Sequence, residues 1–553
     1  MGHQKVVLGI LDGWGIGPIW GGNAIANSNT PNFTNLWTNF PHTKLMASGK
    51  AVGLSGHEMG NSEVGHFTIG AGRIIPQDAT RISDSIKDKS FFQNKVLLET
   101  INYCKDKNKP LHLMGLLTGS NVHASLDHLF GLLNLLKLTD FRLSVFLHLF
   151  TDGRDSPPES ALELLEKLTI KMQELKIGKI ATLCGRYYAM DRSGHKERVA
   201  KALQCISEGK GVRFDSAKKA ISDTYRKGMT DEYIDPTNIF ENNLPIGLIK
   251  KSHAVIFFNF RHDRATEITA QITKQIHRLK FVSFVPYKTY DMPKNAIACF
   301  EMPVVKNNLT EVISRNGLSQ MHIAESEKFA HVTYFFNGGT DEEFPRARRI
   351  KIHSLPLLSF RDSPRMRVDD VAQMTIRATQ HKYDFVLFNI ANADMMGHIG
   401  QSNLVTKAIE AVDENLIKIS SACQKNNYVF VLTADHGNAE ELIDPKTGEP
   451  SSTHSSNPVP FIIVPVSSCP VKKEQIYAGW GLSSIAPTIL QLMGIGIPPE
   501  MTSPSLIKKF VAPAQSTQSS IPMSGRIQTQ TSVQSPTVQK SILQNPSPII
   551  NIR

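Results

Sequence analysis

The chain has 553 residues, with 61 Lys and Arg against 50 Asp and Glu, which gives a formal net charge of +11 at pH 7. This length exceeds what one hydrophobic core can organise, so about two to four domains are expected. Part of the positive charge has a local origin, because residues 501–553 contain no Asp or Glu. The net charge therefore does not indicate nucleic-acid binding, and we expect no nucleic-acid partner.

The cysteine pattern and the apolar runs favour a cytoplasmic protein. The six cysteines are scattered without a CxxC pair, which is typical of reduced thiols. The N-terminal apolar run is interrupted at Asp12, so we expect no signal peptide. No apolar stretch has the length needed to cross a bilayer, and we expect no membrane association.

The first predicted element is a strand that ends near an acidic residue, and a serine motif follows it. KVVLGILDGWG is a continuous apolar run that delivers Asp12 at the carboxyl end of a buried parallel strand. The motif GNSEVGH then places Ser62 among small and polar residues. A serine hydroxyl becomes a competent nucleophile when a cation lowers its pKa. We therefore predict that Ser62 is the nucleophile, and that a metal site lies beside it.

The middle of the chain carries arginines at the ends of apolar runs. They occur in LSVFLHLFTDGRD, KIATLCGRYYAMDR and AVIFFNFRHDR. The planar guanidinium fork suits carboxylate and phosphate oxygens, so the pattern predicts an anionic substrate. The residues concerned are Arg154, Arg186, Arg192, Arg261 and Arg264, with the carboxylate of Asp155 among them.

Two later runs and a loop supply further acidic and imidazole side chains. In FVLFNIANADMMGHIG, Asp394 and His398 are four residues apart and share one face if a helix begins there. In YVFVLTADHGN, the predicted strand Val429–Leu432 precedes Asp435 and His436. Ligands collect at the carboxyl ends of strands in open α/β sheets.

His454, in a loop before the run PFIIV, completes the set of candidate metal ligands. Sorted by chemistry, they predict two divalent ions, one held by Asp12, Ser62, Asp435 and His436 and the other by Asp394, His398 and His454. Mixed carboxylate and imidazole ligands suit Mn²⁺ or Zn²⁺, and we expect Mn²⁺ first. Taken singly, each of these residues could instead be a helix cap, a turn former or a satisfied core residue.

The order of the motifs predicts two α/β domains, because short apolar strands alternate with amphipathic segments such as Glu159–Leu175 and Val405–Cys423. The ligand residues flank the arginine-rich region. We therefore expect a discontinuous metal-binding domain at residues 1–76 and 303–508, with a substrate-binding domain at residues 77–302 inserted into it.

The motifs stand in the order found in one known family. DGWG, GNSEVGH, DGRD, GRYYAMDR, EKFAHVT, ANADMMGH and TADHGNAE occur between about Lys5 and about Lys508. The chain resembles the cofactor-independent phosphoglycerate mutases of the alkaline phosphatase superfamily. The resemblance implies an alkaline-phosphatase-like metal domain and a glycolytic isomerase that interconverts 3-phosphoglycerate and 2-phosphoglycerate through a phosphoserine at Ser62, without bisphosphoglycerate.

The resemblance also implies roles for residues outside the metal set. Asp155 resembles the residue that moves protons at the glycerate hydroxyls, His123 resembles a substrate-binding histidine, and Lys328 resembles a lysine that meets the phosphate. Closure of the substrate domain over the metal domain would exclude water, which separates transfer from hydrolysis. Phosphoglycerate is the expected partner, and the two-domain plan needs no second subunit, so we expect a monomer.

Some positions depart from the family pattern. Ser120 and Asn121 replace a Gly-Gly pair before His123, while Phe360 and Arg361 replace a Tyr-Asp pair and Arg365 replaces a glutamate. These changes could alter domain closure. A metal-dependent phosphatase and a non-catalytic phosphoglycerate-binding protein therefore remain as alternatives, although no nucleophile or ligand is missing.

The end of the chain has a different composition. Residues 512–553 are rich in Ser, Gln, Thr and Pro, which predicts a disordered extension because little apolar area can be buried. The alternative is a short partner-binding motif at Ile549–Ile552.

Overall fold

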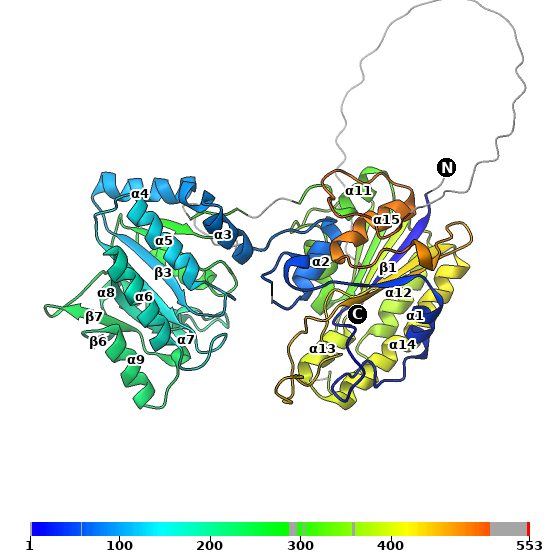
Figure 1. Ribbon diagram of the computed structural model, residues 1–553, viewed down its shortest axis with the longest axis horizontal. Helices are drawn as coiled ribbons and strands as arrows, with labels where there is room; N and C mark the ends of the chain where they lie inside the picture. The colour runs from blue at the N-terminus through cyan, green and yellow to red at the C-terminus, as the bar shows by residue number, and fades with distance from the viewer. Residues whose placement is uncertain are drawn as a thin grey trace, which may run out of the picture. The chain divides into compact units, whose positions relative to one another are not determined.

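The computed structural model describes residues 3–56, 58–286, 296–301, 305–356 and 360–508, and the backbone of 550–552. It divides into two compact units, one formed by residues 1–75 and 304–553 and the other by residues 76–303. Each unit has a β-sheet with helices packed against it, as Figure 1 shows. The predicted α/β fold class is confirmed.

The first unit is built on an eight-stranded sheet of order β17-β13-β12-β14-β1-β15-β16-β2. Its inner strands are parallel, whereas β16 is antiparallel to both β15 and β2. The strands are β1 (Lys5–Leu11), β2 (His42–Leu45), β12 (Gln320–Glu325), β13 (Ala347–Ile352), β14 (Phe385–Ile390), β15 (Tyr428–Thr433), β16 (Val459–Val464) and β17 (Ile550–Ile552).

The helices of the first unit form two packed groups. One group joins α1 (Pro31–Asn39), α12 (Val368–Gln380), α13 (Asn392–Ile399) and α14 (Ser402–Lys425), and the other joins α2 (Ser62–Ala71), α11 (Leu309–Arg315) and α15 (Ile485–Met493). The central strands β1, β14 and β15 are buried along almost their whole length. Burial on both faces explains why these strands are continuous apolar runs rather than alternating ones.

The second unit has a nine-stranded sheet of order β11-β10-β9-β3-β4-β5-β7-β6, with β8 paired to β7. Strands β3, β4, β9 and β10 run parallel, and β7 is antiparallel to β5. The strands are β3 (Leu111–Leu117), β4 (Val145–Thr151), β5 (Lys179–Gly185), β6 (Val212–Phe214), β7 (Thr237–Glu241), β8 (Leu244–Pro245), β9 (Ala254–Phe257), β10 (Lys280–Ser283) and β11 (Ile297–Ala298).

Eight helices of the second unit lie in the described part of the chain. They are α3 (Asp78–Lys87), α4 (Lys95–Lys107), α5 (Leu126–Leu138), α6 (Ala161–Leu175), α7 (Arg186–Ala189), α8 (Lys196–Glu208), α9 (Ala217–Arg226) and α10 (Thr266–Gln275). The predicted amphipathic segments at 159–175 and 405–423 correspond to α6 and α14. Each unit buries its own hydrophobic core.

Most of the C-terminal extension at residues 512–553 lies outside the described residues. The exception is β17, whose backbone pairs in parallel with β13 and forms the edge of the sheet. These three residues therefore differ from the expectation of disorder. In the described part of the chain, all six cysteines are buried without disulfides, and no helix has the length and apolar character needed to cross a membrane.

Candidate active site

The carboxyl ends of three neighbouring strands in the first unit bring the candidate metal ligands together. Asp12 follows β1, Asp394 lies in the first turn of α13 after β14, and Asp435 and His436 follow β15. Three sets of side chains place their ligand atoms within 4.8 Å of one another: Asp394 with His398 and His454, Asp12 with His66 and Asp435, and Asp12 with Asp394 and His436. The unit thus contains two adjoining candidate metal sites.

Ser62 lies at the N-terminus of α2 and points into this cluster. Its hydroxyl donates to Asp12 Oδ1 at 3.0 Å and lies 3.0 Å from His436 Nε2. The Asn61 side chain caps the helix by accepting from the Val64 amide at 3.0 Å. Gly65 is required here, because a Cβ at this position would lie 2.6 Å from the Asp435 carbonyl oxygen. The motif GNSEVGH therefore serves both the helix start and its close approach to Asp435.

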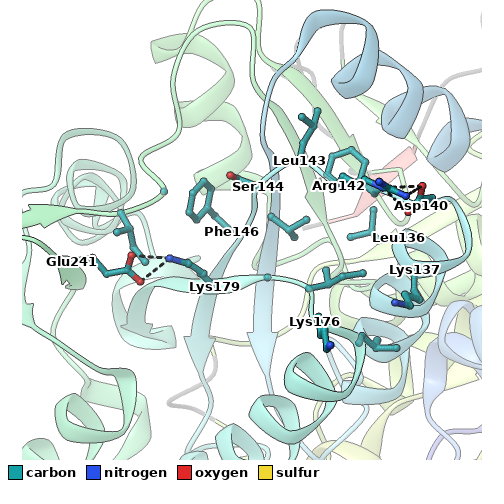
Figure 2. A pocket seen from close by; sticks show the side chains of 17 residues that line it. Leu136, Lys137, Asp140, Arg142, Leu143, Ser144, Phe146, Lys176, Lys179 and Glu241 are labelled. Carbon is teal, nitrogen blue, oxygen red and sulfur yellow. Dashed lines mark hydrogen bonds and ion pairs between the residues drawn. The ribbon is translucent and has the colours of Figure 1, made fainter.

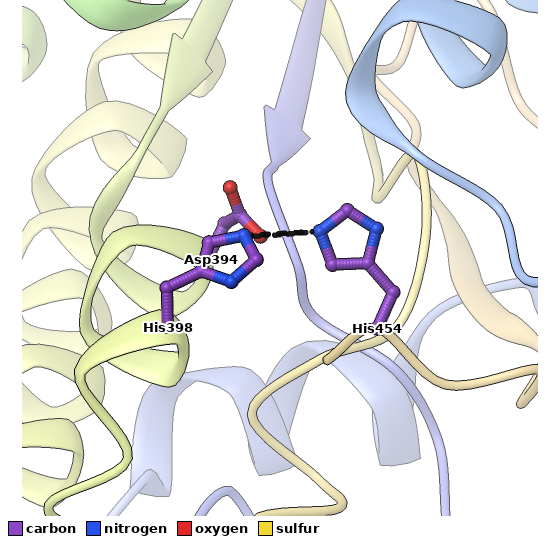
Figure 3. Close-up of side chains that lie close together, drawn as sticks. All are labelled: Asp394, His398 and His454. Carbon is purple, nitrogen blue, oxygen red and sulfur yellow. Dashed lines mark hydrogen bonds and ion pairs between the residues drawn. The ribbon is translucent and has the colours of Figure 1, made fainter. Parts of the chain in front are cut away.

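Asp394, His398 and His454 form a compact group, shown in Figure 3. The two imidazole Nε2 atoms lie 3.4 Å and 3.3 Å from Asp394 Oδ1. Each Nδ1 lies 2.8 Å from a backbone carbonyl, that of Ser452 for His398 and that of Gly60 for His454. Such carbonyl contacts fix the ring orientation of metal-binding histidines and leave Nε2 free to bind.

Lys328 enters the same cluster from the turn after β12. Its ammonium donates to Asp12 Oδ1 at 2.7 Å, to Asp394 Oδ2 at 2.5 Å and to Ser62 Oγ at 2.8 Å. Burial alone would lower the pKa of Lys328, but the surrounding carboxylates raise it above its ordinary value. Burial opposes ionisation of Asp12 as well, and the Lys328 ammonium nevertheless keeps the Asp12 pKa far below the usual range. A buried cation therefore stands beside the hydroxyl of Ser62.

Three residues of the cluster were not anticipated from the sequence. His66 Nδ1 lies 2.8 Å from the Ser62 carbonyl oxygen and 3.2 Å from Asp435 Oδ2. Asn389 donates to Asp12 Oδ2 at 2.8 Å, and Asn438 donates to Asp394 Oδ1 at 2.8 Å. His66 could have been found, since it follows Ser62 by four residues and shares its helix face.

The predicted arginines meet at the carboxyl ends of β4, β5 and β9 in the second unit. Arg186 is the best buried of them, and its Nη1 lies 2.6 Å from Asp152 Oδ1 and 2.5 Å from Asp155 Oδ2. Burial opposes the charge of Asp152, but its hydrogen bonds and the Arg186 guanidinium together lower the pKa of that carboxyl. Asp152, which sequence reasoning missed, thus anchors Arg186 and helps to hold Asp155.

His123 and the remaining arginines lie around the carboxylates of Asp155 and Asp263. His123 Nε2 lies 3.6 Å from Asp155 Oδ2, and its Nδ1 lies 3.8 Å from Asp263 Oδ1. Burial and the charges of Arg186 and Arg261 lower the pKa of His123 to about 4. Asp263, which sequence reasoning also missed, pairs with Arg192 at 2.9 Å and with Arg261 at 3.1 Å.

Arg154 and Arg264 are the least constrained members of this arginine cluster. Arg154 Nη1 lies 3.7 Å from Glu232 Oε1, and Arg264 Nη1 donates to the Met190 carbonyl oxygen at 3.3 Å. Partial burial and the charges of Arg192, Arg186 and Arg154 lower the pKa of Arg264. The neighbouring arginines add to the effect of burial, and a face with several guanidinium groups favours an anionic ligand.

The positions expected from the sequence to depart from the family pattern are accommodated locally. Asn121 adopts φ +55°, a left-handed conformation that asparagine tolerates better than most residues other than glycine. Phe360 is buried in the core of the first unit. Arg365 pairs with Asp369 at 2.9 Å and with Glu414 at 2.7 Å. The positive charge of Arg365 is therefore balanced by carboxylates of the first unit.

The sheet topology and the two adjoining Asp/His clusters define a metalloenzyme of α/β architecture. A family model described as the Metalloenzyme superfamily matches residues 4–497. The chain is 44% identical over 520 residues to the 2,3-bisphosphoglycerate-independent phosphoglycerate mutase of Clostridium perfringens, covering 92% of this chain and 100% of that protein. The enzyme of the same description from Moorella thermoacetica is 42% identical over 519 residues, covering 92% of this chain and 99% of that protein.

A solved structure agrees with these sequence relatives. The structure of Leishmania mexicana phosphoglycerate mutase at low cobalt concentration matches with a TM-score of 0.69 and 27% identity, covering 91% of this chain and 98% of that one. The chain belongs to the 2,3-bisphosphoglycerate-independent phosphoglycerate mutases. The family expected from the sequence is confirmed.

Proposed function

We propose that the protein interconverts 3-phosphoglycerate and 2-phosphoglycerate through a phosphoserine at Ser62, with two divalent metal ions and without bisphosphoglycerate. The observation that carries the proposal is the placement of Ser62. Its hydroxyl contacts Asp12 and His436, each at 3.0 Å, in a buried cluster of carboxylates and imidazoles. This is the environment that activates a serine for phosphoryl transfer.

The donor set fits two divalent cations. Asp435 Oδ2 is buried and accepts no hydrogen bond from the described residues, although His66 Nδ1 lies 3.2 Å away, so a cation there would satisfy it. One ion would be held by Asp12, Ser62, Asp435 and His436, and the other by Asp394, His398 and His454. When bound, the ions would lower the pKa of the Ser62 hydroxyl and neutralise charge on the phosphoryl group. We propose Mn²⁺ as the metal, since its preferences match these ligands.

The chain's own residues support the transfer in three ways. Ser62 stands at the N-terminus of α2, where the helix dipole favours an anionic phosphoryl group. The Lys328 ammonium, 2.8 Å from Ser62 Oγ, would stabilise charge on the attacking or departing oxygen. The anchored rings of His398 and His454 keep the site rigid, because their Nδ1 contacts fix their orientation.

The arginine cluster would hold the substrate. Arg154, Arg192, Arg261 and Arg264 offer exposed or half-exposed guanidinium groups around the buried Arg186. Their forks suit the carboxylate and phosphate of phosphoglycerate. Turnover requires that a substrate held there reaches Ser62, and that glycerate stays bound until the phosphoryl group returns to it.

Asp155 would move protons at the glycerate hydroxyls. Its Oδ2 is oriented by Arg186 Nη1 at 2.5 Å and lies 3.6 Å from His123 Nε2. With a pKa of about 4, His123 is neutral near pH 7 and can exchange hydrogen bonds with the substrate without adding charge. Asp155 acts as base toward the hydroxyl that attacks and as acid toward the oxygen that departs.

We further propose that the protein works as a monomer in the cytoplasm. All residues that we assign to the two clusters come from one chain. The phosphatase and non-catalytic alternatives differ from the mutase in the product that they would yield.

The direct test adds purified protein and Mn²⁺ to 3-phosphoglycerate without bisphosphoglycerate and follows the products by phosphorus NMR. The proposal predicts 2-phosphoglycerate. Accumulation of inorganic phosphate would identify a phosphatase, and an unchanged substrate spectrum would identify a binding protein. Ser62→Ala is the matched control, because it removes only the hydroxyl and should yield neither product.

A further inference from the structure

A basic pocket lies in the first unit, at the edge of the sheet opposite Ser62. It has a volume of about 630 Å³ and is formed by the amino-terminal ends of β12 and β13 and by the end of α12. Arg346 immediately precedes β13, and His381 immediately follows α12. The Ser62 cluster lies instead at the carboxyl ends of the strands in this sheet. The basic pocket is therefore separate from the candidate active site.

The lining of the basic pocket combines several cationic side chains. Arg346, Arg348, Arg377 and His381 line the pocket, and none of its lining residues in the described part of the chain is a carboxylate. Within the described ranges, none of these four side chains forms an ion pair. The neighbouring carboxylate of Asp384 is not part of the lining, and its Oδ2 accepts from the amide and the hydroxyl of Ser319 at 2.8 Å and 2.7 Å. Guanidinium groups that are free in this way are suited to phosphate.

The floor of the basic pocket is apolar. Met321, Ile350 and Met374 are buried there, and the ring of Tyr383 is half-buried at its side. Arg346, just before β13, alternates with Arg348 and Ile350 of the strand, and Arg348 pairs in register with Met321 of β12. The arginine side chains and the apolar floor therefore face the same cavity. Methionine side chains adapt to flat rings and contact them favourably.

We propose that the basic pocket binds an organic phosphate with a flat apolar body, which is the chemistry of a nucleotide. The arginines would receive the phosphate groups, and Met321, Met374 and Tyr383 would receive the base. The volume falls in the range of small-molecule sites, roughly 300–1,000 Å³. This site goes beyond the phosphoglycerate chemistry, since its ligand cannot reach Ser62 from the opposite edge of the sheet.

A pocket of similar volume in the second unit provides the comparison (Figure 2). It is lined by residues around the start of β4 and β5 and measures about 660 Å³. Two of its cations are already paired, Arg142 with Asp140 at 2.9 Å and Lys179 with Glu241 at 2.7 Å. These pairs make it a poorer anion site and a suitable control.

The test measures the fluorescence anisotropy of N-methylanthraniloyl-ATP on the full chain, in excess Mg²⁺ and with 3-phosphoglycerate saturating the substrate site. The double variant Arg348→Ala/Arg377→Ala should bind the probe about tenfold or more weakly, since charge-assisted hydrogen bonds are lost. The control Arg142→Ala/Lys179→Ala, which removes the same charge from the other pocket, should bind as the wild type does. Unlabelled ATP should displace the probe better than inorganic pyrophosphate does.

Each alternative outcome overturns the proposal. Equal affinity in the Arg348→Ala/Arg377→Ala variant would place the probe elsewhere. Binding of the probe that appears only when 3-phosphoglycerate is omitted would place it in the candidate active site. Equal competition by pyrophosphate and ATP would show that the apolar floor receives no base. The mutase assay of Ser62 is independent of all three results, so failure of this proposal is distinguishable from failure of the proposed function.

Discussion

Protonation of His128 should destabilise the second unit in mild acid. The imidazole is fully buried in α5, its Nε2 lies 2.8 Å from Ser83 Oγ, and the rings of Phe260 and Phe284 pack against it. Burial lowers the pKa of His128 to about 4 from 6.5. The unfolded chain therefore binds the proton more tightly than the folded protein does. The stabilising contribution is complete above about pH 6.5 and is lost as the pH falls toward 4.

The two pKa values give the size of the effect. Between pH 7 and pH 5, His128 alone should cost about 2 kcal/mol of unfolding free energy. His128→Gln retains a hydrogen-bonding partner for Ser83 and cannot take up the proton. The variant should be less stable than the wild type at pH 7, and the difference should shrink by about 2 kcal/mol at pH 5.

The assay must report the second unit alone. The four tryptophans, at positions 14, 20, 37 and 480, all lie in the first unit, so their fluorescence does not serve. Urea titrations followed by hydrogen exchange of peptides from α5 report the unfolding of the second unit alone. His277→Gln, on the surface, controls for the removal of one histidine. A stability difference between wild type and His128→Gln that is the same at both pH values would refute the reasoning.

Three further predictions concern the two clusters. Asp394→Asn should reduce bound Mn²⁺ from two ions to one without unfolding, and unchanged stoichiometry by metal analysis would contradict the assignment. Neighbouring carboxylates outweigh burial and raise the pKa of His436 to about 10. Mn²⁺ uptake at neutral pH should therefore release protons, which an indicator dye measures. Uptake without proton release would exclude His436 as a ligand. Arg186→Leu leaves the carboxylate of Asp152 buried and without its ion-pair partner, so it should lower the free energy of unfolding by about 3–5 kcal/mol. Arg154→Leu, at an exposed arginine, should lower it by less than about 1 kcal/mol. Equal losses of unfolding free energy in urea titrations would count against the burial argument.

Much of the site could be predicted because its residues follow strands that are readable as apolar runs. Asp12, Asp435 and His436 each come directly after such a run, and parallel strands bring their carboxyl ends to one edge. Asp394 and His398 share a helix face through their spacing. These patterns are local in the sequence, which is why they could be recognised without the structure.

The supporting residues could not be assigned in the same way. Asn389 lies inside a buried strand and contacts Asp12, which is distant in sequence, whereas Asp263 pairs with Arg261 nearby and with the distant Arg192. The basic pocket has the same character, since residues around 320, 348 and 377 meet only in the folded sheet. The antiparallel pairing of β16 with β2 at the sheet edge likewise leaves no local signal in either strand.

The central claim is that Ser62 accepts the phosphoryl group and returns it. It is tested most directly by mixing the Mn²⁺-loaded protein with 3-phosphoglycerate labelled with ³²P, quenching in acid and mapping the labelled peptide. The account predicts label on Ser62 in the wild type and none in Ser62→Ala. Formation of 2-phosphoglycerate at the wild-type rate in Ser62→Ala, or label on another residue, would contradict it.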